Sequence, residues 1–344
     1  MAIPTTLALG LEGHNPKAVA RLATCSAVDS PVALTMPMTE IATQLVLVFG
    51  VLATLFVGPG IAIAFLLARK KRRRAQRRSP IGIDLLRSPG HTVREQLEEA
   101  STDLMSDVLL LCVIPMVALS IFLAQAQVRG LAGVSRLAPL YVAFVVAFIA
   151  WTVRKLVKAG EQLDHLRAGF DAELAVGQEL DQLMLSGARV FHDFPAEGFN
   201  IDHIVISSQG VFAVETKGYT KPGDISGKEA ARVLFDGKVL KFPTWTTSEP
   251  IEQAERQAQW LSKWASGATG EKVLAWPVVA LPGWFVERTG RSLVRVYSGR
   301  ALGSLLNSGS GEAVSPQAMQ RIAHQVEQRC RTVVPTYRRD LEKK

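Results

Sequence analysis

Cysteine is scarce in this chain of 344 residues, with only Cys25, Cys112 and Cys330 at widely separated positions. They form no Cys-x-x-Cys pair and no Cys/His spacing of the kind that binds structural zinc. An odd number of scattered cysteines also provides no disulfide framework. The sequence therefore argues against a disulfide-rich scaffold and against a zinc-stabilised fold.

The first 38 residues lack a basic stretch followed by an apolar core, so they make a poor signal peptide. Met36 and Met38 lie just before the first long apolar run and are alternative start positions to Met1. Internal repeats and low-complexity segments are also missing. We therefore expect an N-terminal extension over residues 1–40, followed by a membrane region.

Charge is absent from three long runs in a chain that is 48% hydrophobic. Residues 41–68 form an uncharged run of 28, and residues 108–127 and 137–153 form two more. About 20 apolar residues suffice to cross a bilayer, and soluble helices rarely run so long without a charged face. We expect three transmembrane helices, at about 41–68, 108–128 and 137–153. The alternative for each is a buried helix in a soluble core.

Acidic residues are absent from residues 69–78, "RKKRRRAQRR", which contain eight basic ones. Such a run can contact nucleic acid through phosphates. Beside a membrane span we favour a topology determinant that lies against anionic lipid, because basic loops stay on the cytoplasmic side. This predicts an external N-terminus, an internal loop over 69–106, and a cytoplasmic position for everything after Val153.

The membrane region is expected to cover residues 41–156, and a cytoplasmic domain residues 157–344. From Ala159 to the end, 22 basic residues balance 22 acidic ones, so this domain is close to neutral. Its apolar spacing predicts a helix, several strands, a helix, further strands and a closing helix, which is an α/β pattern with a mixed sheet. The expected helices are 161–184, 249–265 and 315–330, and the expected strands are 188–195, the hairpin in 201–219, 231–242, 271–281 and 292–298.

The hairpin "IDHIVISSQGVFAVETKGY" (201–219) carries charges on strands otherwise suited to burial. A turn centred on Ser208 and Gln209 pairs residues whose numbers sum to 417, which places Asp202 opposite Glu215, or one place off if a bulge forms. Lys217 would project from the same face as Glu215. Two adjacent carboxylates repel each other unless a cation or proton lies between them, and such oxygens suit Mg²⁺.

In this interpretation Lys217 stabilises negative charge on a phosphate or an attacking hydroxide. The alternative is that all three are strand-end charges in solvent, with Glu215 and Lys217 forming an ion pair on one face. Spacing alone favours this alternative, because a Glu-x-Lys triplet is common. His203 faces the opposite side of the strand from Asp202, which favours a packed or hydrogen-bonded core histidine.

The hairpin, the upstream helix and the downstream "EPIEQAERQAQWL" together resemble the nuclease-related domain, a bacterial branch of the restriction-endonuclease-like PD-(D/E)XK fold. The resemblance covers about residues 165–285. It implies a restriction-endonuclease-like domain with a mixed central sheet flanked by helices. Together with the three expected spans and the basic 69–78 run, it predicts a multi-pass protein of the bacterial inner membrane with a cytoplasmic C-terminal domain.

The resemblance implies that Asp202 and Glu215 bind Mg²⁺ or Mn²⁺, and that Lys217, Glu173 and Gln253 complete the catalytic set. Glu173 could instead be an exposed helix residue, and Gln253 could cap its helix or bond a loop backbone. The chain departs from the family pattern at Ala172, where the family helix usually has glycine before the glutamate.

Two function classes remain. The first is a membrane-tethered, metal-dependent nuclease that hydrolyses phosphodiester bonds in DNA, or in RNA, at the cytoplasmic face. The second is a catalytically inactive module that recruits nucleic acid or a protein partner to the membrane. The intact Asp, Glu and Lys set favours the first, whereas the neutral charge of the domain favours the second, because phosphate contacts normally need a basic surface.

Overall fold

The computed structural model describes residues 60–73, 80–223, 227, 229–307 and 311–335, together with 42, 46 and 50. The chain divides into two compact units, Met1–Val51 and Leu52–Lys344, and all the labelled elements lie in the second. Residues 42, 46 and 50 and residues 60–73 are helical. The rest of the first expected span, within 41–59, and residues 74–79 of the basic loop lie outside the described residues.

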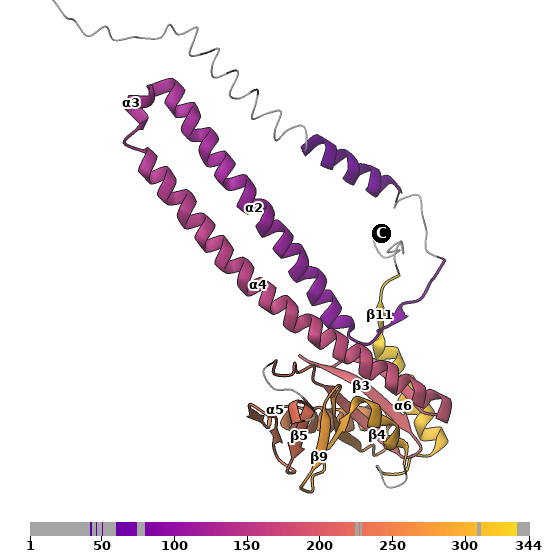
Figure 1. The fold of residues 1–344 in the computed structure, drawn as a ribbon. Helices are drawn as coiled ribbons and strands as arrows, with labels where there is room; N and C mark the ends of the chain where they lie inside the picture. The colour runs from indigo at the N-terminus through magenta and orange to yellow at the C-terminus, as the bar shows by residue number, and fades with distance from the viewer. Residues whose placement is uncertain are drawn as a thin grey trace, which may run out of the picture. The chain divides into compact units, whose positions relative to one another are not determined.

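Two long helices pack against each other as an antiparallel pair, the helical hairpin (Figure 1). These are α2 (His91–Arg129) and α4 (Ala138–Asp181), joined through the short α3 (Leu131–Val134). The rings of Phe122 and Tyr141 meet edge to face, 5.4 Å apart, near the α3 end of the pair. Further along, Lys155 Nζ lies 2.7 Å from Asp107 Oδ1. Both charges flank the uncharged runs at the same end of the helical hairpin.

Among the described residues, α2 and the stretch from Ala138 to Ser186 are long and apolar enough to cross a membrane. Their most apolar windows are only 11% and 6% buried, so most of these side chains face outward. The second and third expected spans lie within these helices. The structure thus supports two candidate spans rather than three, because most of the first expected span is not described.

The third expected span and the expected helix 161–184 are a single helix, α4. Sequence periodicity separated them because apolar residues cover all sides before Val153 and only one side after it. No proline interrupts the stretch between them, so nothing in the backbone ends the helix there. The 3₁₀ turn η2 (Gln182–Ser186) follows directly and ends at Gly187, whose φ is +88°.

A mixed five-stranded sheet forms the centre of the C-terminal part, which confirms the expected α/β architecture. The order is β10-β8-β4-β3-β2, with β10, β8 and β4 parallel and β4, β3 and β2 antiparallel. The strands are β2 (Arg189–Pro195), β3 (Asn200–Ser207), β4 (Gly210–Thr216), β8 (Ala275–Leu281) and β10 (Arg295–Ser298).

Helices cover both faces of this sheet (Figure 1). On one face, α5 (Glu249–Thr269) and α6 (Pro316–Cys330) pack on alternate residues of β3 and β4, such as Ile204 and Ala213. On the other, α4 and the 3₁₀ helix η4 (Gly299–Leu306) pack on the intervening residues, such as Val205 and Phe212. Every residue of β4 is buried, as expected for a strand covered on both faces.

Two smaller sheets complete the domain and were not expected from the sequence. One has the order β7-β6-β5-β9, and the other pairs β1 with β11. The expected strand 231–242 is in fact the two short antiparallel strands β5 and β6, with the 3₁₀ turn η3 (Glu229–Ala231) before them. The bounds are β1 (Leu85–Leu86), β5 (Arg232–Phe235), β6 (Leu240–Lys241), β7 (Thr246–Thr247), β9 (Phe285–Arg288) and β11 (Arg331–Val333).

Candidate nuclease site

The register of the β3/β4 hairpin is the one that the turn predicts. His203 pairs with Val214 and Val205 with Phe212, so paired numbers sum to 417, and the turn lies between Ser207 and Gly210. Continuing this register by one step places Asp202 opposite Glu215 at the open end of the hairpin. Asp202 Oδ2 accepts a 2.7 Å hydrogen bond from the backbone N–H of Thr216, which fixes the carboxylate beside the end of β4.

Glu215 is 2% exposed and lies between two donors. Its Oε1 is 2.8 Å from Lys217 Nζ, and its Oε2 accepts a 2.6 Å hydrogen bond from Gln257 Nε2. Lys217 also donates to Gln253 Oε1 at 2.9 Å. The ion pair of the alternative interpretation is therefore present, but it is not a solvent-exposed strand end, because Glu215 is buried.

Gln253 and Gln257 lie one turn apart on α5, so both side chains point to the same side of the helix. Gln253 holds Lys217, and Gln257 connects Glu215 to the backbone carbonyl of Asn200 at 3.2 Å. We did not single out Gln257 from the sequence. Its i+4 spacing from Gln253 in "QAERQ" is the signal that could have identified it.

Glu173 lies on α4, which covers the face of the sheet opposite to α5. It is 8% exposed, so the alternative that it is an exposed helix residue is wrong. The chain leaves β4 close to this helix, since a Cβ on Gly218 would collide with the Ala168 carbonyl and with the Ala172 side chain. A glycine in the hairpin segment therefore provides the space that the family pattern provides at position 172.

Burial and mutual repulsion raise the pKa values of two of these carboxyl groups. Burial, followed by the charges of Asp193 and Glu215, raises the pKa of Glu173 to about 7. Burial, followed by the charges of Glu215 and Glu173, holds the pKa of Asp202 well above its usual range. These effects indicate that Glu173, Asp202 and Glu215 are close enough to repel one another. A neighbouring cation would favour the ionised form of all three.

Lys217 remains a cation in this site. Burial lowers the pKa of the ammonium group, but the carboxylates of Glu215 and Asp202 outweigh burial, and the net shift is upward. A positive charge therefore persists beside the carboxylates at neutral pH. It is held in place by Glu215 and Gln253 rather than free to move in solvent.

His203 is fully buried, as predicted for a packed or hydrogen-bonded core histidine. Its Nδ1 is 2.9 Å from His192 Nδ1, and His192 Nε2 is 3.0 Å from Asp181 Oδ1. Burial and the neighbouring His192 hold the pKa of His203 well below its usual range. His203 is a neutral core residue that pairs with His192 and is not part of the carboxylate cluster.

A metal site of two carboxylates is consistent with these residues. Within the described ranges, no group of three or more His, Cys, Asp or Glu side chains converges closely enough to enclose a metal ion. Mg²⁺ is commonly bound through one or two carboxylates and keeps several waters, so Asp202 and Glu215 could hold it without a third carboxylate. Two buried oxygens nearby, Thr216 Oγ1 and Gln257 Oε1, have no hydrogen-bond partner within the described part of the chain.

The segment that holds these residues can be compared with known families. Residues 168–282 match the nuclease-related domain. The matched segment contains Glu173, Asp202, Glu215, Lys217 and Gln253, and the match supports the resemblance to the nuclease-related domain that was inferred from the β3/β4 hairpin and its flanking helices. It covers about a third of the chain and leaves out α2 and the first two thirds of α4, up to Arg167. No curated protein and no solved structure gave a match.

Proposed function

We propose that this protein is a membrane-tethered, metal-dependent nuclease with a restriction-endonuclease-like core. It would hydrolyse phosphodiester bonds in DNA, with RNA as the alternative substrate. The observation that carries the proposal is the convergence of Asp202, Glu215 and Lys217, largely buried, at one end of the β3/β4 hairpin. Charged groups are rarely buried together without a functional reason, because burial of each one costs free energy.

Each residue has a separate task in the proposed reaction. Asp202 and Glu215 would hold Mg²⁺ or Mn²⁺, and a bound cation supplies Lewis acidity at a phosphoryl oxygen. Lys217, fixed by Glu215 and Gln253, stabilises the negative charge that develops on the phosphate. The Glu173 carboxyl, with its pKa of about 7, can take up or release a proton near neutral pH.

The helical hairpin would hold this site at the cytoplasmic face of a bacterial inner membrane. Two observations support this tether: α2 and α4 are long and apolar enough to span a bilayer, and most of their side chains in these regions face outward. The orientation rests on the eight basic residues of 69–78. A reporter fused to the C-terminus should be cytoplasmic, and one inserted near Gly133 should be external.

The test uses the full chain purified in detergent, with mixed DNA and RNA substrates and with Mg²⁺ or Mn²⁺ added or withheld. We expect metal-dependent cleavage and a metal-dependent rise in Tm, because a ligand of the native state stabilises it. Asp202→Asn and Glu215→Gln should lose both responses. Lys217→Ala should keep the rise in Tm and lose cleavage. Glu271→Gln, which breaks an exposed ion pair with Arg321, is the control and should behave as wild type.

The recruiting module remains the second candidate because the C-terminal part has 22 basic and 22 acidic residues. In that case the wild-type chain would show neither cleavage nor a metal-dependent shift in Tm. Vesicles that contain the wild-type chain, free of detergent, would instead bind a nucleic acid or a protein partner. Metal-dependent cleavage abolished by Asp202→Asn would exclude this candidate.

A further inference from the structure

The short segment that leads into α2 lies against the candidate site, although it is far from the hairpin in sequence. Pro89 and Gly90 pack on one face of α4: a Cβ on Gly177 would collide with Pro89, and a Cβ on Gly90 would approach Phe170 to 2.8 Å. The same added Cβ on Gly90 would lie 3.7 Å from Glu173 Cβ, so Gly90 also packs beside Glu173. The residue just before a candidate membrane helix therefore lies beside a candidate catalytic residue.

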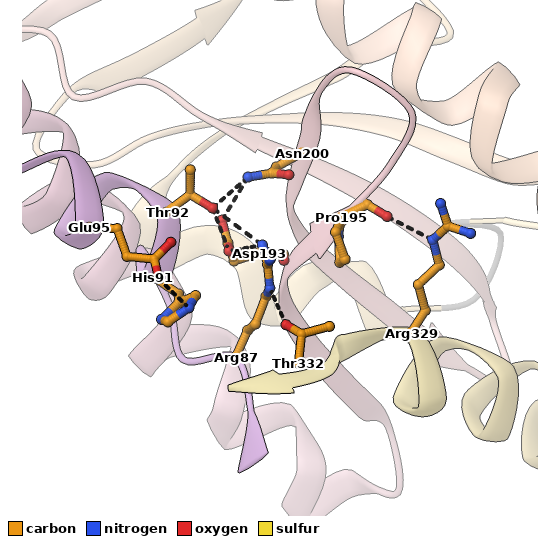
Figure 2. A network of polar contacts seen from close by, with 9 residues as sticks. All are labelled: Arg87, His91, Thr92, Glu95, Asp193, Pro195, Asn200, Arg329 and Thr332. Atoms are coloured by element: carbon orange, nitrogen blue, oxygen red, sulfur yellow. Dashed lines mark hydrogen bonds and ion pairs between the residues drawn. The ribbon is translucent and has the colours of Figure 1, made fainter. Parts of the chain in front are cut away.

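The same segment holds the buried carboxylate of Asp193 (Figure 2). Arg87 Nη1 lies 2.7 Å from Asp193 Oδ2, and Thr92 Oγ1 donates to the same oxygen at 2.8 Å. The Asp193 side chain is only 3% exposed. Arg87 also donates to Thr332 Oγ1 at 2.8 Å, which connects the segment to β11.

Asp193 has a backbone conformation that normally favours glycine. Its φ is +48°, and it is the one non-glycine residue in the described ranges with a positive φ. Non-glycine residues adopt this region at a cost and persist there only when their surroundings fix them. The contacts from Arg87 and Thr92 supply that fixation from outside the β2/β3 pair.

Hydrogen bonds continue from this point to a proposed metal ligand. Asn200 Nδ2 donates to Thr92 Oγ1 at 2.6 Å and lies 3.3 Å from Asp193 Oδ1 (Figure 2). The backbone carbonyl of Asn200 accepts from Gln257 Nε2, and the same amide donates to Glu215 Oε2. Asn200 also lies two residues before Asp202 on β3, so both proposed metal ligands are connected to this segment.

We propose that Arg87 and Thr92 are positioning residues for the nuclease site, which the segment leading into the helical hairpin completes. This inference rests on the proposed function and identifies residues outside the nuclease-related domain on which it depends. Thr92 fixes Asp193 and Asn200, Asn200 fixes Gln257, and Gln257 fixes the orientation of Glu215. Gly90, in the same segment, packs beside Glu173. The functional unit is therefore larger than residues 168–282.

The experiment uses the full chain in detergent and compares two Thr→Val variants of the same helix. Thr92→Val keeps the shape of the side chain and removes its hydrogen bonds, whereas Thr102→Val removes only a bond to the Glu98 carbonyl on the exposed side of α2. Calorimetry measures the Kd for Mn²⁺, and a single-turnover assay measures cleavage. Groups that orient metal ligands typically contribute about 10- to 100-fold to metal affinity or activity.

We expect Thr92→Val to weaken Mn²⁺ binding and slow cleavage by about 10- to 100-fold. Thr92→Ser should restore both, because it retains the hydroxyl, and Thr102→Val should match wild type. Wild-type values for Thr92→Val, beside an active wild-type chain, would overturn the inference and leave the proposed function standing. If Thr92→Val loses Mn²⁺ affinity only in proportion to its unfolded fraction, then Thr92 acts on folding alone. That result would also overturn the inference.

The two proposals fail in different ways in this experiment. A wild-type chain that neither binds Mn²⁺ nor cleaves any substrate would remove the proposed function, and the inference with it. Arg87→Met provides a second test, since it removes the charge that faces Asp193. If this variant does not fold, Thr92→Val with its serine rescue still decides the question.

Discussion

The helical hairpin and the α/β domain use apolar residues in opposite ways. In the domain, Phe212 of β4 is fully buried against α4 and η4, and all seven residues of β4 are buried. In the hairpin, Phe144 is 55% exposed, and Leu140 is 65% exposed. The domain is therefore organised around an internal core, whereas the hairpin presents its apolar surface outward. Each region is suited to a different solvent, although the single helix α4 belongs to both.

The largest expected effect comes from placing the same charge in each region. Phe212→Asp should unfold the domain, because it removes a large buried side chain and leaves an unpaired charge, at a cost of several kcal/mol. Phe144→Asp should leave the Tm of the domain unchanged and reduce membrane insertion, since an aspartate at the centre of a span costs about 3 kcal/mol. Thermal melts and membrane fractionation measure the two outcomes. An equal loss of domain stability in both variants would contradict the difference between a buried core in the domain and an outward apolar surface on the helical hairpin.

An intermediate effect is expected from Glu173, on the domain half of α4. Its pKa is raised to about 7 in the folded chain from an ordinary value of 4.5. The folded state therefore holds the proton more tightly, and the free energy of unfolding falls as pH rises between these two values. The full loss is up to about 3 kcal/mol.

Glu173→Gln removes this titration. In melts without divalent metal, the variant should resemble wild type near pH 4 and be more stable than wild type near pH 8. Glu179→Gln, on the same helix, is the control and should retain the pH dependence of the wild type. Parallel pH profiles for wild type and Glu173→Gln would show that the folded environment does not favour protonation of Glu173.

The smallest expected effect on stability comes from an ion pair in the helical hairpin, on the N-terminal part of α4. Lys155 and Asp107 form an ion pair whose lysine side chain is 50% exposed. Such pairs contribute about 0.2–1 kcal/mol, because solvent screens them and ordering both side chains costs entropy. A double-mutant cycle with Lys155→Gln and Asp107→Asn should give a coupling in this range. A coupling of several kcal/mol would mean that the pair is effectively buried in the membrane-bound protein.

The sequence was sufficient to predict the register of the β3/β4 hairpin and the positions of the five strands of the central sheet. The turn at Ser208 and Gln209 and the period of two along β3 and β4 are local signals, so the pairing of residues that sum to 417 could be read directly. The same applies to α5 and α6, which have strong amphipathic patterns. Glu173 and Gln253 came instead from the resemblance to a known family.

The contacts from Arg87 and Thr92 could not be predicted in this way. They join residues about 100 positions apart, and neither "LRSPGHT" nor the strand β2 contains a periodic or turn signal that refers to the other. The positive φ of Asp193 is equally hidden, because aspartate does not demand that conformation. The continuity of α4 was missed for a different reason, since its surroundings change halfway along while its backbone does not.

That continuity sets a distance. From Val153, where the uncharged run ends, to Glu173 is 20 residues of unbroken helix, or about 30 Å along its axis. If α4 crosses a bilayer, the carboxylate cluster stands roughly this far from the lipid surface, whereas electrostatic potentials decay over about 8 Å at physiological ionic strength. Anionic headgroups would then exert almost no repulsion on a polyanion at the site. A stiff spacer of this length would allow the proposed nuclease to act on a nucleic acid beside a negatively charged membrane.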